Sequence, residues 1–148
     1  MKHLFNVIDR RIAGFMDKIG LPALRISLGI IFIWFGILKT IGLSPAEGLV
    51  LDTVNWMPLF SAEVWLIIIG WWEVVIGVCF LFKPTIRIAI GLLAMQMAGT
   101  LLPLFILTDI TFQAGYLPYA PTMEGQYIIK NLLIISAAIA VGGSVRKN

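Results

Sequence analysis

Four long runs of apolar residues are the dominant pattern along the chain. They cover residues 21–43, 64–82, 88–108 and 125–145. A hydrocarbon core of about 30 Å is crossed by roughly 20 helical residues, so each run is long enough to span a bilayer. The pattern predicts an all-α fold, in which a four-helix transmembrane bundle forms one membrane domain over residues 21–148.

The stretch before the first run, residues 1–20, has a different pattern. Apolar residues recur there at helical spacing and alternate with charged residues, as at Ile8, Ile12 and Ile19. This predicts an N-terminal amphipathic helix in the membrane interface, whose cations favour anionic head groups. A docking helix for a cytoplasmic partner has the same pattern. The Gly20-Leu21-Pro22 sequence predicts a break between this helix and the first span.

The composition points to a membrane protein. Of 148 residues, 59% are apolar and 13% are charged, which is about half the charged share of a soluble domain. The net charge of +3 comes from cations beside the apolar runs and not from a basic stripe, so nucleic acid is not expected as a partner. Most cations flank the spans on one side: Lys2, Arg10, Arg11, Lys18, Arg25, Lys83, Arg87, Arg146 and Lys147.

The connections at 44–63 and 109–124 contain no Lys or Arg. The positive-inside rule therefore predicts a multi-pass membrane protein with both termini in the cytoplasm and these two loops outside.

Turn and aromatic residues suggest local structure near the outer surface. The sequence from Ser44 to Glu47 is typical of a capping box and predicts a short helix that runs to about Thr53. Pro103 should kink the third span. Aromatic residues of both outer loops form either an interfacial belt or a stacking platform for a ring-bearing ligand; these are Trp56, Trp65, Phe112, Tyr116 and Tyr119.

The single cysteine and the single histidine exclude several redox sites. Cys79 stands alone, so neither an internal disulfide nor a Cys-x-x-Cys pair can form within one copy. His3 stands alone as well, so bis-His haem ligation and a His-rich metal site are excluded within one copy. We expect no metal site and no covalently bound cofactor.

Charged and polar residues inside the spans are the candidates for function, because a charge in hydrocarbon is costly and normally faces the bundle interior. Glu73 lies near the middle of the second span. Gln96, Thr100 and Ser136 lie at similar depth, and Lys39, Lys130 and Glu63 lie nearer the outer surface. Either lysine could turn outward to water or inward to one of the two glutamates.

Two interpretations of this polar set remain open. Glu73 and a lysine could form a staple that specifies helix packing. Alternatively, the set could bind a quinone head group or a small anion, or serve a proton step. Gly29, Gly36, Gly70 and Gly77 of the first two spans are expected to permit close helix approach.

Three motifs resemble the DoxX-like family of small four-span membrane proteins, especially its YkgB-like branch. They are Arg25 followed by FIWFGILK at 32–39, GWWEVVIG at 70–77, and TMEGQYIIKNLLI at 122–134. The resemblance covers residues 21–145. It implies a subunit or partner of a membrane oxidoreductase system, linked to quinone or to oxidative stress. By position it points to Arg25, Lys39, Glu73, Glu124, Gly125, Gln126 and Lys130.

The leading hypothesis is an integral accessory subunit of such a system in the inner (cytoplasmic) membrane. Its ligand pocket is built from Lys39, Glu73, Gln96 and Lys130 and is expected to hold quinone or lipid. Residues of secondary interest are Arg25, Glu63, Thr100, Glu124, Gln126 and Ser136. The expected partners are membrane lipids, a redox protein subunit and a second copy of the chain. The alternatives are a small solute or proton transporter and a purely structural membrane module. A self-contained enzyme is not expected.

Overall fold

The structure is a computed structural model that describes residues 2–145, with side chains from residue 6 onward. Arg146 and Lys147, which contribute to the predicted topology, lie outside the described residues, as do the side chains of Lys2, Leu4 and Phe5.

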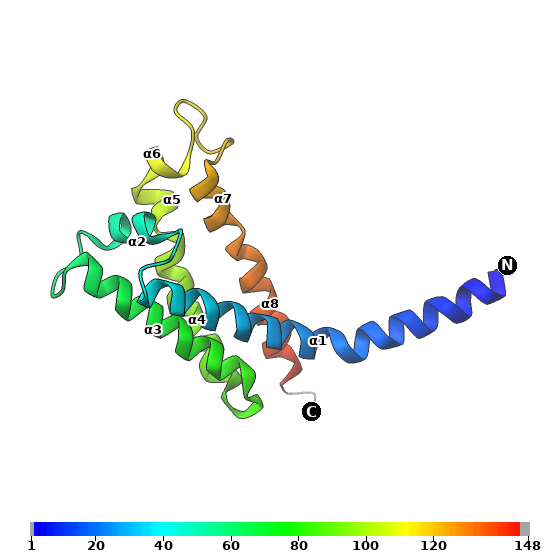
Figure 1. Cartoon of the computed structure of the whole chain (residues 1–148). Coiled ribbons are helices and arrows are strands. Elements are labelled where there is room, and N and C mark those ends of the chain that lie inside the picture. Colours follow the sequence, from blue (N-terminus) through cyan, green and yellow to red (C-terminus); the bar gives the residue numbers. More distant parts are fainter. Residues whose placement is uncertain (1, 146–148) are drawn as a thin grey trace.

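The fold is all-α, as predicted, with four helices long and apolar enough to cross a membrane. These four spans extend over Asn6–Thr40, Ala62–Leu81, Lys83–Ile106 and Met123–Ser144. Figure 1 shows them crossing one another, with the short outer-loop helices at one end of the molecule. The elements are α1 (Lys2–Thr40), α2 (Glu47–Val54), α3 (Ala62–Leu81), η1 (Lys83–Thr85), α4 (Ile86–Leu101), α5 (Pro103–Ile106), α6 (Thr108–Thr111), α7 (Met123–Ile129) and α8 (Asn131–Ser144).

The predicted break at Gly20-Leu21-Pro22 is wrong. Helix α1 continues without interruption for 39 residues and contains Pro22. A proline removes one backbone donor but can be tolerated within a helix when its freed carbonyl is satisfied otherwise. The amphipathic segment and the first span therefore form one helix, whose first half leads away from the other helices (Figure 1).

The most extensive contact between helices is that of α1 with α3, and glycines make it possible. A Cβ atom placed on Gly36 would lie 2.5 Å from the Gly70 carbonyl oxygen, and one on Gly70 would lie 2.8 Å from the Gly36 carbonyl oxygen. Gly77 and Gly29 repeat this contact two turns away, where a Cβ on Gly77 would lie 2.6 Å from the Gly29 carbonyl oxygen. The prediction that these four glycines permit close approach is confirmed.

A hydrophobic core fills the space between all four spans. Side chains from α1, α3, α4 and α8 contribute to it, and Ile76, Phe80 and Ala89 are completely buried. Its other buried members are Leu28, Phe32, Ile86, Leu93, Met97, Ala138 and Val141. This core joins the third and fourth spans to the α1–α3 pair.

The third span is interrupted at the expected proline. Helix α4 ends at Leu101, and a short helix, α5, begins at Pro103. Proline has no amide hydrogen, so the regular bonding pattern is lost here, and Leu102 donates instead to the Gly99 carbonyl at 3.2 Å. The break separates the outer part of this span from α4.

The first outer loop contains the short helix predicted there, with a later start. Helix α2 begins at Glu47 and its N-cap residue is Ala46, so Ser44 is not the cap. The Ser44 hydroxyl instead accepts a hydrogen bond from the Ala46 amide at 3.3 Å, which stabilises a turn before the helix. Helix α2 packs on α3, and its residues Thr53 and Val54 are buried.

The second outer loop is fixed to the start of α7. The Thr122 amide donates to the Thr111 carbonyl at 3.0 Å, and the Thr122 hydroxyl donates to the Ile110 carbonyl at 2.6 Å. The same hydroxyl caps α7 by accepting a bond from the Gly125 amide. Gly125 packs so tightly on the Thr111 carbonyl that a side chain has no room there.

Candidate functional site

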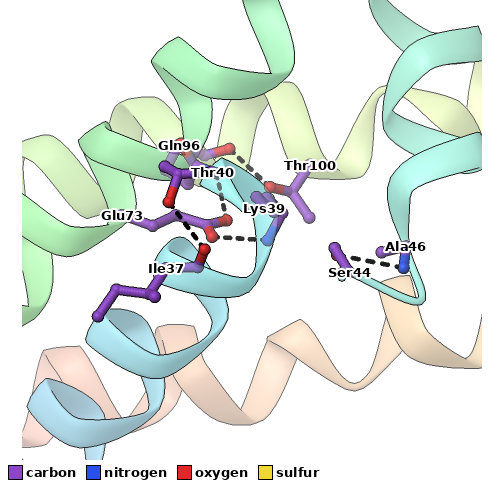
Figure 2. A network of polar contacts seen from close by, with 8 residues as sticks. All are labelled: Ile37, Lys39, Thr40, Ser44, Ala46, Glu73, Gln96 and Thr100. Carbon is purple, nitrogen blue, oxygen red and sulfur yellow. Dashed lines mark hydrogen bonds and ion pairs between the residues drawn. The ribbon is translucent and has the colours of Figure 1, made fainter. Parts of the chain in front are cut away.

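A buried ion pair joins the first two spans. Lys39 lies in the last turn of α1, and its Nζ donates to Oε2 of Glu73, in the middle of α3, at 2.6 Å. Their side chains are 10% and 11% exposed. Figure 2 shows the two side chains pointing toward each other between the helices. Among residues 6–145 this is the only salt bridge.

The third span completes the cluster. The Gln96 amide, on α4, donates from Nε2 to Oε1 of Glu73 at 3.0 Å. One turn later, the Thr100 hydroxyl donates to the Gln96 backbone carbonyl at 2.9 Å (Figure 2). Both carboxylate oxygens of Glu73 thus have a partner from a different helix, which is the condition for keeping a charge inside a protein in hydrocarbon.

The glycine contact positions the ion pair. Gly36 and Gly70 lie three residues before Lys39 and Glu73, close to one helical turn, so each glycine is on the same side of its helix as the charged residue. A Cβ on Gly70 would lie 3.1 Å from Cβ of Lys39. Because the backbones approach so closely here, the lysine can reach the carboxylate within the protein interior.

Lys130 and Glu63 are not part of this cluster. Lys130 lies at the junction of α7 and α8 with an exposed side chain, and its Nζ is 5.7 Å from the centre of the Tyr127 ring. Glu63 is exposed in the first turn of α3. The structure therefore selects Lys39 as the partner of Glu73 and separates Lys130 from the pocket predicted to contain both lysines.

Other residues of the predicted polar layer also lie elsewhere. Ser136 is exposed and its hydroxyl donates to the Leu132 carbonyl of its own helix at 2.9 Å, so it does not join Glu73. Glu124 and Gln126 are exposed in the first two turns of α7. The shared layer thus contains side chains from α1, α3 and α4 only.

Arg25 belongs to a separate contact at the other end of the α1–α3 pair. Its Nη1 donates to the backbone carbonyls of Leu81 at 2.9 Å and Phe80 at 3.3 Å. These carbonyls end α3 and have no partner within the helix. A cation at a helix C-terminus also interacts favourably with the helix dipole. The sequence analysis did not predict that Arg25 caps α3. The signal that could have indicated it is a cation in the first span at the level where the second span ends.

The outer aromatic residues are not one uniform belt. Trp56, Tyr116 and Tyr119 are exposed, whereas Phe112 is buried in the outer loop. Trp65 packs edge-on against Phe60, with ring centres 5.4 Å apart.

Two hollows lie outside the ionic cluster. An open apolar groove of about 470 Å³ runs between α3 and α4, lined by Ile67, Ile68, Trp71, Trp72, Val75 and Leu92. Trp71 and Val75 each lie two residues from Glu73 on α3, so they occupy the opposite side of the helix. A second cavity, of about 230 Å³, lies in the outer loop around Asp109, Phe112 and Gln113. Neither hollow is lined by Lys39, Glu73 or Gln96.

The cluster can donate hydrogen bonds to a further group. The Lys39 ammonium has three N–H bonds and the Gln96 amide has two, and each uses one on Glu73. Each of the two groups therefore has N–H donors that its bond to Glu73 does not use.

The fold and the cluster define a class: a multi-pass helical membrane protein with an intramembrane ionic site. Neither family models, curated proteins nor solved structures gave a match to this chain.

Proposed function

We propose that this chain is an integral-membrane accessory subunit or partner of a quinone-linked or oxidative-stress-related oxidoreductase system. In this proposal the Lys39–Glu73–Gln96 cluster binds the head group of a quinone, while the redox chemistry belongs to a partner protein. The resemblance of the motifs at 32–39, 70–77 and 122–134 to the DoxX-like family supports the assignment to oxidoreductase systems.

The observation that carries the proposal is the donor set of the cluster. A quinone offers carbonyl oxygens, which accept hydrogen bonds, and its ring is apolar enough to enter the hydrocarbon region. Lys39 and Gln96 present uncommitted N–H groups, and Glu73 holds both of them in place. When bound, the quinone would supply the capacity to accept electrons and protons. The protein residues would orient the ring, and Glu73 would exchange a proton with Lys39.

Native mass spectrometry with lipid extraction tests the proposal on the full-length protein purified in mild detergent. We expect wild-type protein to retain quinone, and Gln96→Leu and Lys39→Met to lose most of it. Lys130→Met is the matched control, because Lys130 is also a cation within a span but is exposed, lies beside Tyr127 and forms no salt bridge with Glu73. Retention of quinone by Gln96→Leu, or its loss in Lys130→Met, would contradict this site.

A purely structural module is the second candidate, and one observation favours it. Both oxygens of Glu73 already have partners within the protein, so the cluster is complete without a ligand. In that case a joint replacement of Lys39 by Met and Glu73 by Gln leaves function intact, as measured by survival under oxidative stress. Loss of survival with normal protein levels would favour the quinone site.

A further inference from the structure

The first half of α1 has no protein cover. Every described side chain from residue 6 to residue 23 is exposed. Figure 1 shows this half of the helix leading away from the bundle. With 39 residues, α1 is about 58 Å long, roughly twice the thickness of a hydrocarbon core. Only its second half is needed to cross the membrane.

One side of this uncovered half is apolar. Ile8, Ile12, Phe15 and Ile19 follow each other at intervals of three or four residues and therefore share one face of the helix. They are 50%, 54%, 64% and 42% exposed. A continuous apolar face of this kind is unstable in water and requires a cover.

The apolar face is in register with the lipid-facing side of the span. Ile26 lies 18 residues after Ile8, which equals about five helical turns, and it is exposed on the outside of the bundle together with Ile30. For its first half to lie on the membrane surface while its second half crosses the bilayer, α1 must bend between them, and Pro22, inside the helix, is the residue type at which helices bend. A bend toward the Ile26 side turns the apolar face onto the membrane. The register therefore favours a position over lipid and not beneath the other spans.

Cations line one edge of the same face. Arg11, Lys18 and Arg25 are seven residues apart, close to two turns, so they form a single row along the helix. The row ends at Arg25, which is bonded to the end of α3 and thus lies where the spans leave the hydrocarbon. Asp9 and Asp17 lie on other sides of the helix. With the first half of the helix along the membrane surface, Arg11 and Lys18 would therefore lie at the same depth as Arg25, beside the phospholipid phosphates.

We propose that residues 6–20 of α1 lie along the surface of the leaflet at the Arg25 end, with the apolar face among the acyl chains and Arg11 and Lys18 on anionic phosphates. The occupant of this surface is an anionic bilayer. The proposal is independent of the quinone site, because none of its residues contacts Lys39, Glu73 or Gln96.

Depth measurements on the full-length protein in nanodiscs test the position of the helix. Single cysteines at Ile12, Phe15, Asn6 and Asp17, in a Cys79→Ala background, carry an environment-sensitive fluorophore. Lipids brominated in their acyl chains then quench the labels that lie in the bilayer. We expect positions 12 and 15 to be quenched at least about twofold more strongly than positions 6 and 17.

Two results would overturn this position. Labels at 12 and 15 that are as accessible to water as those at 6 and 17 would show a helix free in solution. Labels at 12 and 15 that are shielded from water but not quenched by bromine would show that protein, such as a second copy, covers this face.

The charge contribution is tested by a pair of adjacent arginines. Arg11 lies in the cationic row, whereas Arg10 lies one residue away, on the polar side of the helix. In nanodiscs with about one-third anionic lipid, we expect Arg11→Gln to shift the equilibrium from the surface-bound to the free helix about fivefold, and Arg10→Gln to change it much less. Equal effects of the two substitutions, or equal quenching in purely zwitterionic nanodiscs, would overturn the role of the row.

Discussion

Lys39 and Glu73 are 34 positions apart in the chain, and their charged atoms are 2.6 Å apart inside the membrane-spanning region. The pair stands one turn from the Gly36–Gly70 contact, where the backbones of α1 and α3 approach most closely. The glycines and the ion pair therefore act together, since the glycines bring the helices close enough for the lysine to reach the carboxylate.

Removing Lys39 alone should be strongly destabilising. Lys39→Met leaves Glu73 with only the Gln96 amide as partner, and breaking one side of a buried pair costs about 3–5 kcal/mol. Unfolding in increasing denaturing detergent, followed by circular dichroism, measures the loss. The joint variant Lys39→Met with Glu73→Gln should recover part of the loss, because no unpaired charge remains. An unchanged stability in Lys39→Met would show that the ion pair contributes nothing to the fold.

The packing of α1 on α3 predicts that alanine substitutions at two glycines differ sharply in their effect on stability. Gly36→Ala puts a methyl group against the Gly70 backbone, which cannot give way as a flexible side chain does, and we expect a loss of about 1–3 kcal/mol. Gly91→Ala is the matched control in another span, because its Cβ would meet nothing within 4 Å. The same unfolding assay should find Gly91→Ala at least as stable as wild type. Equal losses in both variants would contradict the tight contact.

Arg25 should stabilise the end of α3. Arg25→Met removes the donor to the Phe80 and Leu81 carbonyls, and we expect a loss of about 1–2 kcal/mol with faster amide hydrogen exchange in the last turn of α3, at residues 78–81. Arg87→Met removes a neighbouring exposed arginine and should leave the exchange unchanged. If exchange at residues 78–81 is the same in all three proteins, Arg25 does not cap this helix.

The predicted topology can be measured with single cysteines in a Cys79→Ser background. A cysteine at Lys83, in the turn between α3 and α4, should react with a membrane-impermeant reagent only after the cells are opened. A cysteine at Tyr119, which is exposed in the second outer loop, should react in intact cells. Labelling of position 83 in intact cells would reverse the orientation.

The sequence is sufficient to predict the spans and the close pair of helices. Runs of apolar residues define the four helices, and small residues at seven-residue spacing in the first two spans indicate their contact. It also selects Glu73 and Gln96 as members of a buried layer. It cannot choose between Lys39 and Lys130, because both have flexible stems and lie near the outer ends of their spans. The choice depends on the α1–α3 packing, which only the three-dimensional arrangement contains.

Short sequence motifs predicted local structure less well where packing or backbone geometry favours a different arrangement. The Gly20-Leu21-Pro22 sequence is typical of a break, but α1 continues through it. The Ser44 capping motif starts a turn and not the helix, because α2 begins at Glu47. The sequence predicts Ser136 at the depth of Glu73, yet its side chain is exposed and bonds to its own helix. The sequence gives the position of a residue along its span. The side of the helix on which the residue lies relative to the other spans depends on how the helices pack.

The ion pair joins α1 and α3, two spans that are synthesised one after the other. When α3 leaves the ribosome, α1 is already present, and the glycine faces of the two helices can meet before α4 exists. The ammonium of Lys39 and the carboxylate of Glu73 can then neutralise each other as a helical hairpin enters the bilayer, which avoids the cost of about 2.5 kcal/mol or more for each isolated charge. Gln96 arrives with the next span and bonds to a pair that is already formed. Along the chain, the two charged residues thus come first and can neutralise each other, and the uncharged hydrogen-bond donor follows.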